Sequence, residues 1–187
     1  MDFADLRGIE LLNRGHDRKA FHCGVENLDN YLRDRAISDT EKNLSRVFVL
    51  TLKATPNTFA NTIVGYYSLS SLVVPLEDLP VAIAKNLNYR VIGTTLLGKL
   101  AVAEDWQRDR CRLRIGEHIL LHAMVTAWRA SQSVASWALV VDVLISENDP
   151  TGFYVKHGFL GFQDSPGKLF LPMATIENTL GATGVIE

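Results

Sequence analysis

A tyrosine near the carboxyl end of the chain has the type and position needed for acid–base chemistry. Tyr154 lies in the segment 147–158 (ENDPTGFYVKHG), directly after an almost wholly apolar stretch at 137–145 (WALVVDVLI). That stretch predicts a strand covered on both faces in the middle of a sheet. Ligands commonly bind beyond the carboxyl ends of such strands. On a short helix there, a phenol with a reference pKa of about 10 could donate a proton to a departing thiolate, the alternative being simple aromatic packing.

A turn rich in arginine is the second candidate site. Arg108, Arg110, Arg112 and Arg114 alternate between a predicted strand at 95–103 and a long predicted helix at 112–131. The start of a helix presents free backbone N–H groups and the positive end of a dipole, which together suit a pyrophosphate. The turn, which ends at Gly116, could therefore bind phosphate, although a charged turn can also be an ordinary solvated loop.

The elements that position these residues follow from hydrophobic periodicity and turn signals. Apolar residues at three- and four-residue spacing predict a helix at 25–40, and Pro150 with Asn148 or Asp149 as N-cap predicts the start of the short helix at 147–157. The segment 73–89 holds two prolines and predicts an irregular connection with one short helix. Further strands are predicted at 46–53, 61–70, 159–163 and 168–173, with loops at 54–60 and 164–167. The order indicates a mixed α/β layer architecture.

The composition fits one folded domain over residues 1–187. The chain is 47% hydrophobic and 21% charged, unlike a disordered protein, and its net charge of −2 argues against indiscriminate binding of polyanions. The first 15 residues lack the pattern of a signal peptide, and no run of about eighteen apolar residues could span a membrane. We therefore expect a cytoplasmic protein that does not enter a membrane.

The cysteines and histidines do not predict a metal site. Cys23 and Cys111 lack CxxC or Cys/His spacing, and we expect Cys23 to be buried. His118 and His122 are four residues apart and could share a metal on one helix face, but no further ligand lies nearby in the pattern. We expect no bound metal.

Six short blocks, in order along the chain, resemble motifs of a known family. Three are similar to successive motifs of the GNAT acetyltransferases, and three are similar to blocks of the subgroup of bacterial toxins that acetylate aminoacyl-tRNA. The GNAT blocks are 97–102 (LGKLAV), 116–121 (GEHILL) and 153–159 (FYVKHGF), and the toxin blocks are 21–24 (FHCG), 28–32 (LDNYL) and 65–69 (GYYSL). The resemblance implies a GNAT fold, with a mixed, mostly antiparallel central sheet flanked by helices.

The resemblance also implies acetyl-CoA as cofactor and assigns residues to it. The pantetheine arm would pair with the backbone of Leu100, Ala101 and Val102, Tyr154 would be the general acid, and Asn148 would help to hold the cofactor or that tyrosine. In the phosphate turn, Arg114 stands where the family has its first glycine, and Cys111 where it has glutamine or arginine. The candidate cofactor contacts in and around this turn are Gln107, Arg108, Arg112, Arg114, Ile115, Gly116 and Glu117.

The activity implied is acetylation of the α-amine of charged tRNA, which blocks translation. Phosphate contacts would come from basic residues near the helix at 25–40, although Arg33 and Arg35 could merely solvate a helix face against Asp29 and Asp34. The candidates are Arg18, Lys19, Arg33, Arg35 and Arg46, with Arg14 and Lys42 nearby. Such toxins form homodimers and bind ribbon-helix-helix antitoxins. The alternatives are acetylation of a small amine or a protein amine, and a non-catalytic GNAT-fold binding module.

Overall fold

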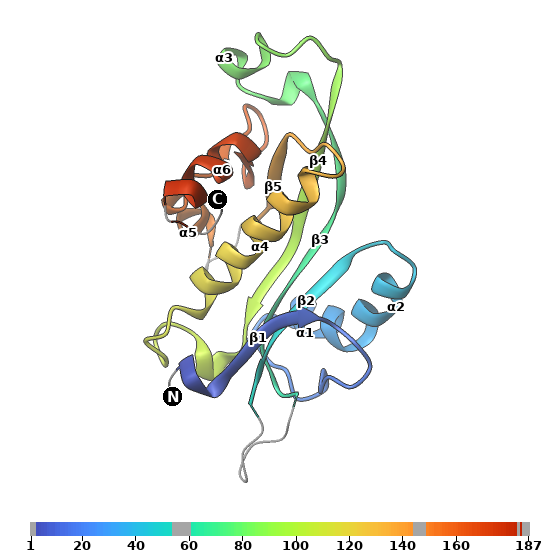
Figure 1. The fold of residues 1–187 in the computed structure, drawn as a ribbon, viewed down its shortest axis with the longest axis vertical. Coiled ribbons are helices and arrows are strands. Elements are labelled where there is room, and N and C mark those ends of the chain that lie inside the picture. Colours follow the sequence, from blue (N-terminus) through green and yellow to red (C-terminus); the bar gives the residue numbers. More distant parts are fainter. Residues whose placement is uncertain (1–2, 54–60, 144–148, 183, 185–187) are drawn as a thin grey trace. The chain divides into compact units, whose positions relative to one another are not determined.

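A computed structural model of the chain describes residues 3–53, 61–143, 149–182 and 184 (Figure 1). The chain forms two compact units. The first contains Met1–Ser70 and Gly98–Ala123, and the second contains Ser71–Leu97 and Met124–Glu187. Strands β3 (Ile63–Pro75) and β4 (Val91–Val102) and helix α4 (Ile115–Ser131) each contribute residues to both units. The interpretation of the whole chain as a single domain stays a prediction.

Hydrogen bonds join seven strands in the order β1-β2-β3-β4-β5-β7-β6. Besides β3 and β4, these are β1 (Leu6–Leu11), β2 (Arg46–Leu52), β5 (Ala138–Asp142), β6 (Leu160–Gly161) and β7 (Lys168–Pro172). The ladders of β1 with β2, β2 with β3, β5 with β7 and β6 with β7 are antiparallel, whereas β4 and β5 are parallel. The expected fold class, a mixed and mostly antiparallel sheet flanked by helices, is confirmed. No helix in the described ranges combines the length and the apolar character needed to cross a membrane.

The first unit packs a helical segment against strands. The segment runs through α1 (Glu26–Asn30), a π-helical turn (Tyr31–Arg35) and α2 (Ala36–Glu41), which confirms the helix predicted at 25–40 but adds a π turn. Its apolar side chains pack with Phe21, Tyr66 and Ala101, and the Phe21 and Tyr66 rings meet edge to face at 5.4 Å. The strands are β1 (Leu6–Leu11), β2 (Arg46–Leu52) and the adjoining parts of β3 (Ile63–Pro75) and β4 (Val91–Val102).

The second unit contains the buried strand that precedes Tyr154. In β5 (Ala138–Asp142), the first four residues are buried, as predicted from the apolar stretch. It pairs with β4 at Thr95↔Leu139 and with β7 (Lys168–Pro172) at Val140↔Phe170. Val140 and Phe170 belong to the core of this unit. The other helices within the described ranges are α3 (Val81–Ala84), α4 (Ile115–Ser131), α5 (Thr151–Lys156), α6 (Met173–Ala182) and 3-10 turns at Phe3–Asp5, Leu76–Asp78 and Glu104–Trp106.

Several boundaries differ from the sequence-based expectation. The opening of the chain, read only as polar, forms the edge strand β1, because pairing with β2 satisfies its backbone. Strand β3 continues to Pro75 and β4 begins at Val91, so the irregular connection is shorter than predicted. Strand β6 (Leu160–Gly161) has only two residues, and α6 was not expected. The predicted loop at 54–60 lies outside the described residues.

Candidate functional site

The strand predicted to hold the pantetheine arm extends beyond its partner. The ladder between β4 and β5 covers Thr95–Leu97 among the described residues, whereas β4 continues to Val102. Leu100, Ala101 and Val102 therefore lie past the end of that ladder. Strand backbone that no neighbouring strand covers carries N–H and C=O groups that a ligand can pair with, since each residue has one donor and one acceptor. The Val102 carbonyl oxygen already accepts a hydrogen bond from Gln107 Nε2.

Gly65 on β3 permits close packing around this strand. A Cβ at position 65 would lie 2.4 Å from Ile119 Cδ1 and 2.9 Å from the Ala101 carbonyl oxygen. Real Cβ atoms essentially never approach other atoms so closely, and the carbonyl is backbone that cannot turn away. The glycine of the GYYSL block thus allows α4 and β4 to lie close against β3.

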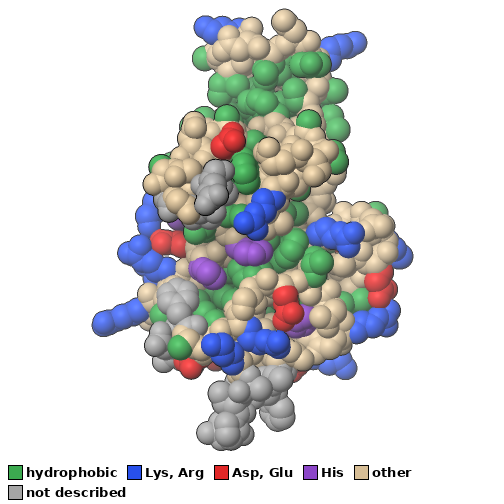
Figure 2. Space-filling model, in the orientation of Figure 1, with side chains coloured by type: hydrophobic (Ala, Val, Ile, Leu, Met, Phe, Trp, Pro, Cys, Tyr) green, Lys and Arg blue, Asp and Glu red, His purple; other side chains and the backbone are tan. Residues whose placement is uncertain are grey.

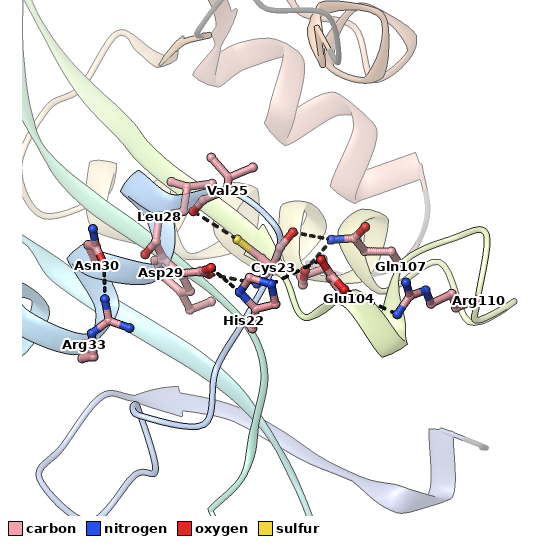
Figure 3. A network of polar contacts seen from close by, with 12 residues as sticks. His22, Cys23, Val25, Leu28, Asp29, Asn30, Arg33, Glu104, Gln107 and Arg110 are labelled. Carbon is pink, nitrogen blue, oxygen red and sulfur yellow. Dashed lines mark hydrogen bonds and ion pairs between the residues drawn. The ribbon is translucent and has the colours of Figure 1, made fainter.

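The side chain of Gln107 links the end of β4 to the segment before α1 by two hydrogen bonds. Its Nε2 donates to the carbonyl oxygens of Val102 at 3.0 Å and Cys23 at 2.8 Å (Figure 3). Two backbone carbonyls from distant parts of the sequence are satisfied by one side chain. The amide of Gln107 is thus engaged within the protein, and its contact with a cofactor stays a prediction.

The four arginines in the turn before α4 differ in their neighbours. Arg108 and Arg112 are exposed, whereas Arg110 lies 3.3 Å from Asp105 and 3.5 Å from Glu104. Ile115, the first residue of α4, is buried, which anchors the helix start. All four arginines of the turn are exposed, and two of them, Arg110 and Arg114, have acidic neighbours.

Arg114 adopts the backbone conformation that glycine favours. Its φ is +49°, in the left-handed region that costs a residue with a Cβ roughly 1–2 kcal/mol. Its carbonyl oxygen accepts the N–H groups of Glu117 at 3.0 Å and His118 at 3.2 Å, so it caps α4, and its guanidinium lies 3.3 Å from Glu117. The resemblance implied a glycine here, and the turn keeps a glycine-like conformation with arginine in place.

An open pocket of about 350 Å³ adjoins the start of α4. By helix geometry, the N–H groups of Ile115 and Gly116 have no partner within the helix. Together with the nearby guanidinium groups and the helix dipole, they suit an anion. The pocket is lined by Arg112, Leu113, Arg114, Glu117, His118 and Leu121.

Tyr154 lies in the second unit, on α5, and is only 8% exposed. Its ring contacts Phe153 at 5.2 Å and Phe159 at 5.4 Å, both edge to face. Burial raises the pKa of Tyr154 to about 12. Among the described residues, its hydroxyl makes no hydrogen bond, so the phenol is protonated at neutral pH and is available to a ligand.

The start of α5 is held by Asp149. Its carboxylate accepts from the Thr151 backbone N–H at 2.9 Å and from the Thr151 hydroxyl at 2.6 Å, and these bonds lower the pKa of Asp149. Pro150 directly precedes the helix, one position earlier than expected. Asn148, the other predicted cofactor contact near Tyr154, lies outside the described residues.

A histidine between two carboxylates was not predicted as a functional feature. His22 Nδ1 donates to Asp29 Oδ2 at 2.7 Å, and its Nε2 lies 3.4 Å from Glu104 Oε1 (Figure 3). Asp29 is buried, and its Oδ1 accepts the Cys23 N–H at 2.9 Å. Burial, followed by a hydrogen bond with Asp29, raises the pKa of Cys23 to about 12, so this buried thiol is unreactive. The FHCG and LDNYL blocks were the only signal.

The predicted RNA contacts all belong to the first unit. Lys19, Arg33, Arg35 and Arg46 are exposed, and the half-buried Arg18 donates to the Arg33 carbonyl oxygen at 2.5 Å. Figure 2 shows Lys and Arg side chains dispersed over the visible face and interspersed with Asp and Glu. Arg14 is already paired with Glu41 at 2.7 Å.

His122, one of the two histidines on α4, contacts aromatic side chains of the strands. His122 Nδ1 lies 2.8 Å from the hydroxyl of the buried Tyr67, whose ring stacks on Phe48 at 4.9 Å. Within the described ranges, no group of three His, Cys, Asp or Glu residues is arranged to hold a metal ion, His118 included. His122 is thus part of the packing between α4 and the strands.

No family model matches the chain, but individual proteins do. The chain is 25% identical to the "Probable toxin TacT" of Sinorhizobium fredii over 184 residues, which cover 95% of this chain and 97% of the relative. It is 29% identical to the "tRNA-acetylating toxin" of Mycobacterium tuberculosis over 165 residues, which cover 88% of this chain and 91% of the relative.

Solved structures agree with these relatives. A tyrosine-to-phenylalanine mutant of KacT superposes with a TM-score of 0.82 at 26% identity, covering 94% of this chain and 99% of that one. AtaT complexed with acetyl-methionyl-tRNAfMet has a TM-score of 0.80 at 27% identity, with the same coverage of 94% and 99%. An AtaT tyrosine-to-phenylalanine mutant, bound to the C-terminus of the antitoxin AtaR and acetyl-CoA, has a TM-score of 0.74 at 25% identity, covering 94% and 98%. The chain has the GNAT fold and, over nearly its whole length, resembles acetyltransferase toxins that act on tRNA.

Proposed function

We propose that the chain is an acetyl-CoA-dependent N-acetyltransferase that acetylates the α-amine of aminoacyl-tRNA and thereby inhibits translation. The observation that carries this proposal is the similarity, at a TM-score of 0.80 over 94% of the chain, to a toxin solved with acetyl-methionyl-tRNAfMet. The relative from Mycobacterium tuberculosis has the same activity in its name. Localisation in the cytoplasm, where charged tRNA is used, is part of the proposal.

Acetyl-CoA is the cofactor of this proposal because the neighbour AtaT was solved with it. When bound, it supplies the activated acetyl group. The residues present fit such a molecule: Leu100, Ala101 and Val102 extend past the β4–β5 ladder, and the start of α4 suits an anion. Arg114, which lines the pocket at that start, adds a guanidinium group able to make charge-assisted hydrogen bonds to phosphate.

Tyr154 serves as the general acid in this proposal. Its phenolic oxygen holds a proton at neutral pH that it can give to the leaving group, as a phenol with the ordinary pKa of 10.0 already does, and burial raises the pKa of Tyr154 further, to about 12. Both neighbours KacT and AtaT were solved as tyrosine-to-phenylalanine mutants, which points to a tyrosine of interest in those proteins. The α-amine of an aminoacyl ester needs little help to become a neutral nucleophile, since an α-amino group has a reference pKa of about 7.7 to 8.0.

The test is transfer of labelled acetyl groups to a mixture of aminoacyl-tRNAs, with deacylated tRNA as control. Label should appear on charged tRNA only, in a linkage released with the acetylated amino acid. Absence of transfer to every charged tRNA would remove the proposal. Acetylation of a small amine is separated by salt: transfer to tRNA should fall steeply as salt rises from about 50 to 200 mM, whereas transfer to a small neutral acceptor should not.

The partners of the protein complete the proposal. We propose that an antitoxin binds it, supported by the AtaT complex with the C-terminus of AtaR. A ribbon-helix-helix fold for that antitoxin and a homodimeric toxin follow from the resemblance alone. Sedimentation of the purified toxin tests the second point, because a single monomeric species at micromolar concentration would contradict it.

A further inference from the structure

Lys99 is a cation in an unusual place on strand β4. It directly precedes the three residues that we assign to acetyl-CoA, is half-buried, and its Nζ lies 4.1 Å from the centre of the Tyr31 ring. An ammonium over an aromatic face is stabilised by the ring quadrupole. Burial lowers the pKa of Lys99, which shows that its charge is held at a cost in hydration.

The charges around Lys99 do not neutralise it. After burial, the negative charge of Asp39 raises the pKa of Lys99 and the positive charge of Arg35 lowers it. Among the described residues, no carboxylate comes within ion-pair distance of the Lys99 ammonium. A partly buried cation is normally paired, because leaving it unpaired costs free energy. The arrangement therefore has room for one more negative group.

The position of Lys99 on the strand decides which ligand it faces. Side chains alternate along a strand, so Lys99 and Ala101 share one face and Leu100 and Val102 the other. Ala101 packs in the cluster that contains Tyr31, on the side of the helical segment 26–41. Lys99 thus lies on β4, on the face that packs with the helical segment 26–41, which carries Arg35, a predicted RNA contact.

We infer that Lys99 binds a backbone phosphate near the 3′ end of the acceptor RNA, with Arg35 as its neighbour on the helical segment. This inference rests on the proposed function, since it identifies the acceptor as RNA. Two cations, Lys99 and Arg35, face one carboxylate, Asp39, and the single negative charge of a backbone phosphate would balance the remaining positive charge. Lys binds phosphate as a point charge. No covalent step involves Lys99.

The test measures binding of fluorescein-labelled deacylated tRNA as a function of salt. Lys99→Met keeps the aliphatic stem over Tyr31 and removes the charge. One lost phosphate contact should flatten the slope of log K against log salt by about 0.7 to 0.9, which corresponds to roughly five- to eightfold weaker binding at 0.1 M salt. Lys99→Arg should restore most of the binding. An unchanged slope in Lys99→Met would overturn the inference.

Matched controls separate Lys99 from general charge and from folding. Lys85→Met removes the same charge from an exposed lysine of the other unit and should leave the slope unchanged. An equal change in both variants would overturn the inference. Acetyl-CoA affinity of Lys99→Met, measured by calorimetry, should match the wild type, and Lys99→Gln serves as second charge-free variant should Lys99→Met melt early.

The same experiments distinguish this inference from the proposed function. If the wild type acetylates charged tRNA while Lys99→Met keeps the full salt slope, the function stands and the role of Lys99 is refuted. If the wild type binds tRNA with a Lys99-dependent slope but transfers no label to any charged tRNA, the function is refuted and the phosphate contact stands.

Discussion

The imidazole of His22 and the carboxylate of Asp29 form a 2.7 Å hydrogen bond, although Asp29 is buried and the His22 side chain is 67% exposed. Because a carboxylate only accepts, His22 carries its proton on Nδ1. Asp29 also accepts the Cys23 N–H, so its charge orients both the imidazole and the turn that precedes α1. The buried Asp29 carboxylate therefore fixes the positions of His22 and Cys23 in the FHCG block.

Asp29→Asn should therefore destabilise the protein. The amide is isosteric, but it replaces two charge-assisted hydrogen bonds with neutral ones, and its NH₂ group faces a donor. Hydrogen bonds to charged groups contribute about 1.5–3 kcal/mol each, so a loss of about 2 kcal/mol in the free energy of unfolding is expected by chemical denaturation. Asp34→Asn, at an exposed position, is the control and should change it by less than about 0.5 kcal/mol. Equal stability of the two variants would show that Asp29 does not organise the turn.

Tyr154→Phe should retain acetyl-CoA binding and lose turnover. The ring packing against Phe153 and Phe159 remains, and only the proton donor is removed. General acid catalysis contributes about 10²- to 10⁴-fold, so kcat should fall by at least about 100-fold. Calorimetry measures binding, and labelled transfer to charged tRNA measures turnover. Near-normal turnover would exclude the phenol as the acid.

The raised pKa of Tyr154 also predicts a dependence of stability on pH. The folded-state pKa of about 12 exceeds the ordinary value of 10.0, because burial disfavours the phenolate. Its contribution to stability is therefore complete below pH 10 and is lost as the pH rises from 10 towards 12. Tyr154→Phe lacks this loss, so the difference in unfolding free energy between variant and wild type should shift in favour of the variant across that window. A constant difference between pH 8 and pH 11, at about one-unit steps, would contradict the burial of the phenol.

The sequence predicted the elements whose signal is local. Strand β5 and helix α4 were found because burial on two faces and a long apolar stripe leave clear patterns. Strand β1 was missed because an edge strand with half-exposed residues is specified by its partner β2 and not by its own sequence. The candidate site residues divide in the same way. Tyr154 was predicted from its residue type and its position after a buried strand, whereas the contact between His22 and Glu104 was not predicted, because it joins residues far apart in the chain.

Arg114 shows where a motif alone was insufficient. Substitution of the family's glycine suggested that the phosphate turn had changed, but the backbone of Arg114 is left-handed, with a φ of +49°, a conformation that glycine adopts readily. A sequence pattern records side chains and not backbone conformation, so it could not show that Arg114 is left-handed. The non-catalytic alternative was considered because arginine replaces glycine at position 114, and the left-handed backbone there weakens that reason.

Replacing Arg114 separates its backbone from its charge. Arg114→Gly and Arg114→Ala both remove the guanidinium, but only glycine relieves the left-handed strain, so Arg114→Gly should be the more stable by about 1 kcal/mol. Thermal or chemical unfolding of the pair measures this difference, which would have the opposite sign inside a helix. If the guanidinium charge contributes to cofactor binding, both variants should bind acetyl-CoA equally weakly and more weakly than the wild type. Wild-type affinity in Arg114→Gly alone would show that the backbone conformation, and not the charge, determines cofactor binding.

Gly65→Ala tests whether close packing at β3 is needed for the cofactor strand. The new Cβ would lie 2.9 Å from the Ala101 carbonyl oxygen and 2.4 Å from Ile119 Cδ1, so β4 or α4 must shift. Overpacking of this kind costs about 1–3 kcal/mol, which chemical denaturation will detect. Gly8→Ala is the matched control, because Gly8 also lies in a strand and its Cβ would meet nothing within 4 Å. Ala101 is one of the predicted pantetheine contacts, so a shift of β4 in Gly65→Ala should lower acetyl-CoA affinity together with stability. In Gly8→Ala, acetyl-CoA affinity should remain unchanged. Full affinity in a destabilised Gly65→Ala would mean that the cofactor does not depend on this part of β4.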